Sequence, residues 1–235
     1  MQSFEERLQE IEVYLDLLEH LEQQVAVGPP KIGESSITTQ QQKILYSSVY
    51  IQLYNLVEAT ITWCIDAVCT AATENGRWKP SDLATLVRRE WIRSTGRTHL
   101  ELTAEHRLNS AVEVCEHLIN ALPLLKFSVE RRNNIDDLVI QQIAERLGLQ
   151  IQLSQEALRG VKQPVRDDKG PLALVKDLRN RLGHGSLSFS ECGEGVTVID
   201  LRDLKARTAL YLREIIVGFR AYIDAYEYLD PARRP

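Results

Sequence analysis

Residues 38–73 read TTQQQKILYSSVYIQLYNLVEATITWCIDAVCTAAT, and this stretch decides the fold. Its apolar residues recur at every third or fourth position, which is the spacing of a helix with a buried face. They are Ile44, Leu45, Tyr46, Val49, Leu53, Leu56, Val57, Ile61, Cys64, Ile65 and Val68. No glycine or proline interrupts them, and Asn75-Gly76 follows with residue types that commonly end a helix. The stretch therefore predicts one long helix.

Shorter segments with the same helical spacing precede and follow the long helix. They are expected over residues 3–26, 81–95, 103–122, 134–147, 171–182 and 201–229. Ser81, which follows a proline, is the expected N-cap of the second of these. The segment at 134–160 is interpreted as a helical insertion. SLSF (186–189) and VTVI (196–199), separated by SECGEG, predict a two-stranded hairpin.

Taken together, these segments predict an all-α bundle that forms one domain over residues 1–235, with a small β-hairpin before the C-terminal helix. The chain carries 44% hydrophobic residues and a formal net charge of −5, an ordinary globular composition. No apolar run approaches the roughly 20 residues that span a bilayer, and the acidic N-terminus is unlike a signal peptide. Four cysteines without CxxC spacing indicate buried thiols in a reducing cytoplasm.

Residues 174–189, LVKDLRNRLGHGSLSF, hold the candidate site. Arg179 and His184 are five positions apart, so on an unbroken helix they would point about 140° away from each other. Gly183 is expected to end the helix at Leu182 in a left-handed conformation and to turn His184 back toward the arginine.

An arginine and a histidine brought together in this way suit phosphate chemistry. A guanidinium is a permanently charged donor for phosphate oxygens and can stabilise charge that develops at phosphorus. An imidazole can take a proton from a ribose 2′-hydroxyl or donate one to a departing 5′-oxygen. Such chemistry needs no metal or other cofactor, and none is expected. The plainer alternative is a helix C-terminus neutralised by cationic side chains.

The stretch RNRLGHG resembles the arginine–four residues–histidine signature of the HEPN superfamily (higher eukaryote and prokaryote nucleotide-binding domains). The likeness extends to the polar Asn180 after the arginine and to YNLVEATI (54–61) on the long helix. One departure is Gly183, where similar sequences often have alanine. The resemblance implies a metal-independent endoribonuclease in which Arg179 and His184 are catalytic and Asn180 positions the substrate or the arginine.

The resemblance also implies partners. HEPN nucleases usually pair as homodimers so that both motifs face one cleft, and they leave a 2′,3′-cyclic phosphate end on RNA. A toxin or antiviral defence effector of this kind would be restrained by an antitoxin or another defence-system protein. Two copies of Lys176 and Arg181 around the cleft would contact the RNA backbone, which would overcome the unfavourable net charge.

Two residues of the long helix complete the predicted site. Glu58 and Asn55 lie among apolar neighbours and are expected to help position the substrate, with Glu58 as a possible ion-pair partner of Arg179. The alternative for Glu58 is a partly exposed glutamate on the helix surface.

Other patterns are read more conservatively. The arginines around Trp91 (Arg88, Arg89, Arg93 and Arg97) are expected to form a solvated helix face, with RNA steering as the alternative. Residues 139–160 only superficially resemble a DNA-reading helix-turn-helix. The competing function for the whole chain is a noncatalytic HEPN module that binds a nucleotide or another protein.

Overall fold

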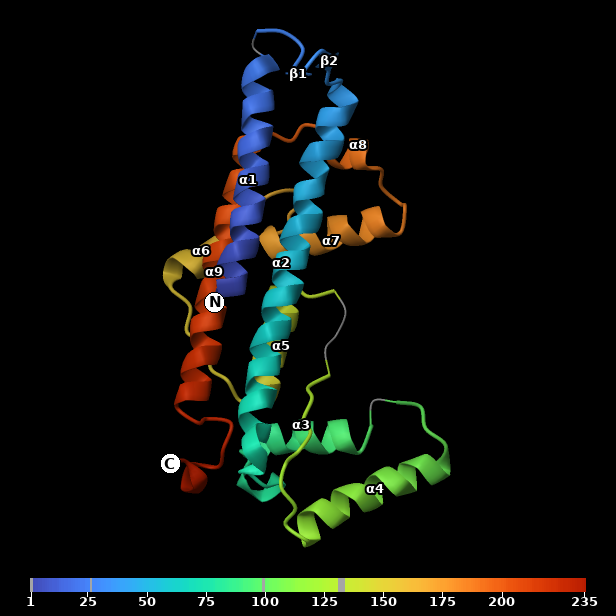
Figure 1. Cartoon of the computed structure of the whole chain (residues 1–235), viewed down its shortest axis with the longest axis vertical. Helices are drawn as coiled ribbons and strands as arrows, with labels where there is room; N and C mark the ends of the chain where they lie inside the picture. The colour runs from blue at the N-terminus through green and yellow to red at the C-terminus, as the bar shows by residue number, and fades with distance from the viewer. Residues whose placement is uncertain (1, 26, 99, 131–133) are drawn as a thin grey trace. The chain divides into compact units, whose positions relative to one another are not determined.

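A computed structural model describes residues 2–25, 27–98, 100–130 and 134–235. The fold is all-α, as predicted (Figure 1). The helices are α1 (Gln2–Val25), α2 (Thr39–Thr73), α3 (Thr85–Thr95), α4 (Ala104–Ile119), α5 (Asp137–Leu147), α6 (Gln155–Lys162), α7 (Pro171–Gly183), α8 (Phe189–Cys192) and α9 (Val198–Asp224). Two-residue strands β1 (Lys31–Ile32) and β2 (Ser35–Ser36) pair antiparallel.

The chain forms two compact units, and each draws on separate segments of the sequence. The first comprises Met1–Thr60, Asn134–Asp137 and Leu153–Glu214, and the second Ile61–Asn133, Leu138–Gln152 and Ile215–Pro235. Helices α2 and α9 contribute to both units. Neither unit is a continuous stretch of sequence, and the interpretation of residues 1–235 as a single domain stays a prediction.

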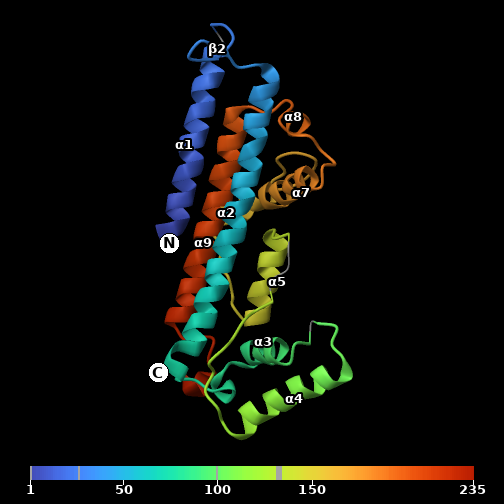
Figure 2. The ribbon, with the colours of Figure 1, turned by 45° about the vertical axis from the view of Figure 1, so that its right-hand side comes forward.

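In the first unit, α1, α2 and α9 run side by side (Figure 1, Figure 2). Helix α1 buries one side chain per turn: Phe4, Leu8, Ile11, Leu15, Leu18 and Leu21. This is the spacing that predicted the N-terminal helix, because residues three and four apart share one helix face. Residue 26, the expected end of that helix, lies outside the described residues.

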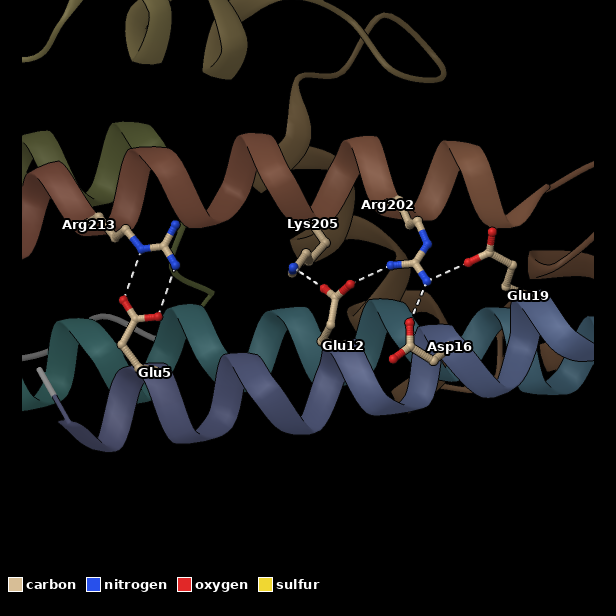
Figure 3. A network of polar contacts seen from close by, with 7 residues as sticks. All are labelled: Glu5, Glu12, Asp16, Glu19, Arg202, Lys205 and Arg213. Atoms are coloured by element: carbon tan, nitrogen blue, oxygen red, sulfur yellow. Dashed lines mark hydrogen bonds and ion pairs between the residues drawn. The ribbon is translucent and has the colours of Figure 1, made fainter.

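Ion pairs join the exposed edges of α1 and α9 (Figure 3). The Arg202 guanidinium binds Glu12 and donates to Asp16 and Glu19, each at 2.7 Å. Lys205 also binds Glu12. Just over two turns beyond Lys205 on α9, Arg213 donates two parallel hydrogen bonds of 2.9 Å to Glu5. Because bonds from Lys205 and Arg202 favour its charged form, the pKa of Glu12 is held below its ordinary value.

Glu12→Gln is expected to destabilise the protein by about 1 kcal/mol at pH 7, since the change removes the anion shared by two cations. The folded-state pKa of Glu12 is lowered, so this stabilisation is present above the ordinary carboxyl pKa and is lost as the pH falls through the lowered value. Urea unfolding from pH 7 to 3 should therefore show the difference between wild type and variant shrinking in acid. Glu10→Gln, an exposed change on the same helix, is the control. A difference that persists unchanged at pH 3 would contradict this account.

Helix α2 begins and ends where its sequence predicts. Beyond Thr73, Asn75 and Gly76 adopt left-handed conformations with φ of 53° and 61°. By length and composition, Thr39–Gly76 is apolar enough to cross a membrane, although no such segment is predicted from the sequence. Half of its most apolar window is buried inside the protein, and a core helix meets the same criterion. Its buried Leu53, Leu56 and Ile61 are the positions that the helical spacing assigns to a core.

In the second unit, α3 begins later than predicted. Its N-cap is Ala84 rather than Ser81, because residues Pro80–Asp82 form a separate 3₁₀ turn whose Asp82 carboxylate accepts from the Lys79 amide at 2.9 Å. The turn is followed by Leu83, which bridges to Leu229 near the C-terminus. A tertiary contact thus holds residues 83 and 84 extended and delays the helix.

Helix α4 packs on α3 with its less apolar face. Ser110 is buried, and His117 lies with its ring centroid 5.8 Å from that of Trp91. Its periodic apolar residues are instead exposed, as is Leu122 just beyond the helix; those within it are Leu108, Val112, Cys115, Leu118 and Ile119. The expectation of four buried thiols is therefore wrong for Cys115, whereas Cys64, Cys69 and Cys192 are buried.

The hairpin predicted before the C-terminal helix is wrong. Residues 186–189 lead into α8, where Ser188 and Glu191 cap each other reciprocally. The Thr197 hydroxyl accepts from the Asp200 amide, so VTVI begins α9 rather than a strand. Side-chain caps here override the β-propensity of valine, isoleucine and threonine. The small hairpin that the structure contains is β1–β2, with Gly33 in its turn at φ 60°.

Candidate active site

Helix α7 carries the candidate site within the first unit, and it lies against α2 with α8 near its C-terminal end (Figure 2). Pro171 occupies the first turn, where the lack of an amide hydrogen costs nothing. The helix buries Pro171, Leu172, Leu174, Val175, Leu178 and Leu182. This apolar face fixes the helix on the core and leaves residues 176, 177, 179, 180 and 181 partly exposed.

Arg179 is held by two contacts. Its guanidinium carbon lies 4.5 Å from the ring centroid of Tyr54 on α2, which is a cation–π distance. Its Nη1 donates to the Asn180 Oδ1 at 3.1 Å. Tyr54 is only 1% exposed, so its ring is a fixed platform, whereas Arg179 remains half-buried. The contacts orient the guanidinium without neutralising it.

The other two cations of α7 have carboxylate partners. Lys176 binds Asp136, and Arg181 lies 3.9 Å from Asp177, which also accepts from Lys169 at 2.7 Å. Among the described residues, Arg179 is the α7 cation that has no carboxylate within 4.0 Å. The contacts that Lys176 and Arg181 were expected to make with an RNA backbone stay a prediction, and both side chains keep some exposure, 29% and 42%.

His184 is exposed at the end of the helix, but the turn there differs from the predicted one. Helix α7 continues through Gly183, and His184 is its C-cap with φ −90° and ψ 0°. Gly185 adopts the left-handed conformation, φ 70°. The Gly185 amide donates to Leu182 O and the Ser186 amide to Arg181 O, which is the Schellman pattern. The expectation that Gly183 ends the helix is therefore wrong by two residues.

This turn determines where His184 points. With helical backbone from Arg179 to Gly183, the two side chains leave the axis about 140° apart. No left-handed residue before His184 brings the imidazole back toward its own arginine, and the two make no direct hydrogen bond.

The two glycines should respond oppositely to alanine. Gly183→Ala is expected to stabilise the protein by about 0.5–1 kcal/mol, because the residue is helical and an added Cβ meets no atom within 4 Å. Gly185→Ala is expected to destabilise it by about 1 kcal/mol, because its φ is 70°. Urea unfolding of both variants measures the difference. If Gly183→Ala instead destabilised the protein, Gly183 rather than Gly185 would be the left-handed residue that ends α7.

The two predicted residues of α2 differ in their surroundings, and Glu58 matches the alternative of a partly exposed glutamate. Asn55 is exposed and Glu58 half-buried. Glu58 forms no ion pair with Arg179, so the expected salt bridge is absent from the single chain, and Tyr54, one turn before Glu58, takes the arginine instead. Sequence reasoning missed Tyr54 because an aromatic residue on an apolar helix is usually core. The one signal in the sequence that pointed to Tyr54 was that Arg179 on α7 needed a partner and no spacing fixed a carboxylate as that partner.

Comparison with known families identifies the fold. Residues 1–228 match the family described as MAE_28990-like HEPN. The chain belongs to the HEPN superfamily. No curated protein and no solved structure gives a significant match. In this HEPN chain, Arg179, Asn180 and His184 lie on the last turns of α7 in the first unit. Within the described ranges, no three His, Cys, Asp or Glu side chains gather closely enough to hold a metal ion.

Proposed function

We propose that this HEPN protein is a metal-independent endoribonuclease in which Arg179 and His184 are the catalytic residues. The observation that carries the proposal is how the Arg179 side chain is held and what it pairs with. Its guanidinium is oriented by Tyr54 and Asn180, lacks a carboxylate partner and lies two turns or less from an exposed imidazole. A fixed, unneutralised guanidinium is a favourable site for a phosphate.

The proposed reaction is an internal transfer. Neutral His184 takes the proton of a ribose 2′-hydroxyl, and the 2′-oxygen attacks the neighbouring phosphorus. The bond from phosphorus to the 5′-oxygen breaks, and that oxygen receives a proton from solvent, to which the His184 imidazolium afterwards returns the proton it took. The products are a 2′,3′-cyclic phosphate and a 5′-hydroxyl. Arg179 stabilises the negative charge that builds on the phosphorane oxygens, and Asn180 holds the guanidinium in place.

The direction of His184 favours a site shared between two chains. Since Arg179 and His184 of one chain diverge along α7, a homodimer that brings the partner subunit's His184 opposite Arg179 supplies both groups to one phosphate. The exposed His184 and Asn55 leave this end of the unit free for a second copy. Two copies also double the local positive charge on an acidic protein.

A nuclease of this kind would act on RNA in the cytoplasm as a toxin or antiviral defence effector. Because unrestrained cleavage would damage the cell's own RNA, an antitoxin or another defence protein would hold it in check. These roles rest on the family resemblance. The competing noncatalytic HEPN module would need the bound arginine but not the exposed imidazole.

The reaction chemistry provides the direct test. Purified protein is incubated with a 5′-labelled single-stranded RNA in EDTA, and the product ends are analysed by mass spectrometry. The proposal predicts cleavage that leaves 2′,3′-cyclic phosphate ends. A matched oligonucleotide with a single 2′-deoxyribose at the cleaved position should be resistant there. Cleavage of the deoxy-substituted position, or products with 5′-phosphate ends, would exclude the proposed attack by the 2′-hydroxyl.

The tyrosine platform gives a further prediction. Tyr54→Phe keeps the aromatic ring and is expected to keep activity within about threefold, whereas Tyr54→Leu removes the stacking, worth about 1–2 kcal/mol, and should lower kcat/KM roughly tenfold. Thermal unfolding of both variants separates a packing defect from a positioning one. Equal activity of the leucine variant at equal stability would show that the platform does not position Arg179.

A further inference from the structure

A second guanidinium lies on the same face of α2 as Arg179. Arg166, in the loop between α6 and α7, has its guanidinium carbon 5.6 Å from the ring centroid of Tyr50. Tyr50 and Tyr54 are both buried and lie one turn, about 6 Å, apart along α2. The helix thus presents two stacked arginines in succession, one from the loop and one from α7.

The loop that carries Arg166 is built as a rigid turn. Asp167 and Asp168 both have left-handed backbones, with φ of 52° and 55°. The Lys169 amide donates to Arg166 O at 2.9 Å, and the Val165 amide to Lys169 O at 2.8 Å. This is the pattern of a two-residue hairpin with a type I′ turn. Lys169 ties the turn to Asp177 on α7, so Arg166 has a fixed position relative to the candidate site.

The positive charge of Arg166 is only weakly compensated by neighbouring groups. Its Nη1 donates to the Cys192 carbonyl at 3.2 Å, and its Nε is buried without a hydrogen bond. The carboxylate nearest to that Nε is Asp167 Oδ2 at 3.9 Å, too far for a hydrogen bond. The side chain is nevertheless 30% exposed. Burial raises the pKa of Tyr50 to about 12, so the ring beneath the arginine stays neutral.

We infer that Arg166 binds a second backbone phosphate of the RNA, next to the phosphate held by Arg179. The inference rests on the proposed function and extends it to substrate binding. The two tyrosines that carry the guanidiniums are about one helical turn apart, which is similar in scale to the spacing of neighbouring phosphates of one RNA strand. Each guanidinium is held over a ring, and among the described residues neither donates a hydrogen bond to a carboxylate. The geometry favours single-stranded RNA with at least two phosphates.

Salt dependence of binding tests the inference. Each phosphate contact on a single strand contributes about 0.7 to the slope of log K against log salt concentration. His184→Ala protein, which is expected to bind RNA without cleaving it, is titrated with a labelled tetranucleotide from 50 to 300 mM KCl. Adding Arg166→Gln is expected to reduce the slope by about 0.7 and to weaken binding about tenfold. Binding of a dinucleoside monophosphate, with one phosphate, should change little.

Two controls separate binding from folding. Arg213→Gln removes one charge from an exposed arginine that pairs with Glu5 on α1, and it should leave the slope unchanged. Arg166→Lys keeps the charge and should keep most of the slope. A lower melting temperature with an unchanged slope would assign Arg166 to the fold alone and overturn the inference. If the wild-type protein cleaves RNA but Arg166→Gln binds like its parent, the inference fails alone; if the wild type neither binds nor cleaves RNA, both fail.

Discussion

His184→Ala is expected to lower the rate of RNA cleavage in EDTA by about 10²–10⁴, the range for removing a general acid or base. Arg179→Ala should cause a loss of the same order, because the guanidinium that stabilises the phosphorane is gone. Since His184 is exposed, its replacement should leave the melting temperature unchanged. Initial rates on a fluorogenic RNA, with protein from parallel purifications, measure both losses.

The matched control is His20→Ala. His20 is an exposed histidine near the end of another helix, α1, where its ring Nδ1 donates to the Asp16 carbonyl at 2.6 Å. Its replacement should leave cleavage unchanged. Cleavage by His184→Ala at the wild-type rate would assign the activity to a contaminant or to another site, and it would favour the noncatalytic reading of the chain.

The largest expected effect on stability is in the second unit, at Glu90. This glutamate is 3% exposed, and its carboxylate accepts from Arg93 Nη1 at 2.6 Å and from Arg146 Nε at 3.1 Å. Arg146 Nη1 also donates a hydrogen bond to the Glu130 carbonyl at 3.2 Å. Arg93 and Arg146 both pair with the Glu90 carboxylate, so replacing it with a neutral amide removes the negative charge from a largely buried position between two cations, at a cost of about 3 kcal/mol.

Glu90→Gln should therefore lower the melting temperature by about 6–12 °C for a chain of this size. Glu145→Gln, at an exposed glutamate beside Arg146 in the sequence, is the control and should change it by little. Differential scanning fluorimetry of the two variants measures the difference. If Glu90→Gln has the same melting temperature as the wild type, the buried carboxylate contributes nothing to stability.

Glu90 also shows what helical spacing cannot reveal. The sequence predicts a solvated face for the arginines around Trp91, but Arg93 pairs with Glu90, and Arg88 donates to the carbonyls of Pro80, Ser81 and Leu83. The contacts of Arg88 depend on the path of the loop before α3, and the second cation at Glu90 is Arg146 of α5, which is distant in sequence. The Glu90–Arg93 pair, at i and i+3 on α3, is local. Periodicity shows only which residues share one helix face.

The helices themselves could be predicted well where apolar spacing, caps and breaks agree. Thr39–Thr73 and Gln2–Val25 both have regular apolar spacing followed by a break, and both are confirmed within a residue or two. Predictions failed where two local signals compete. Gly183 and Gly185 are equally plausible helix stops from their residue type, and only the hydrogen bonds of residues 185 and 186 decide for Gly185.

The candidate site was predicted in part. Arg179, Asn180 and His184 lie where the motif places them, because they are neighbours on one helix and its cap. Tyr54 and Arg166 could not be predicted, since each depends on how α7 and its preceding loop pack against α2. The Glu58–Arg179 ion pair is absent for the same reason, because Arg179 packs on the Tyr54 ring, one turn before Glu58 on α2.

A mixture of two inactive variants tests most directly whether Arg179 of one chain and the partner subunit's His184 form one catalytic site. Arg179→Ala and His184→Ala chains are each expected to be inactive. When they are unfolded and refolded together, half of the dimers are mixed and one of the two sites in each is intact, so cleavage should return to about a quarter of the wild-type rate. Native mass spectrometry confirms that mixed dimers form. Mixed dimers that remain as inactive as the separate variants would contradict the shared site.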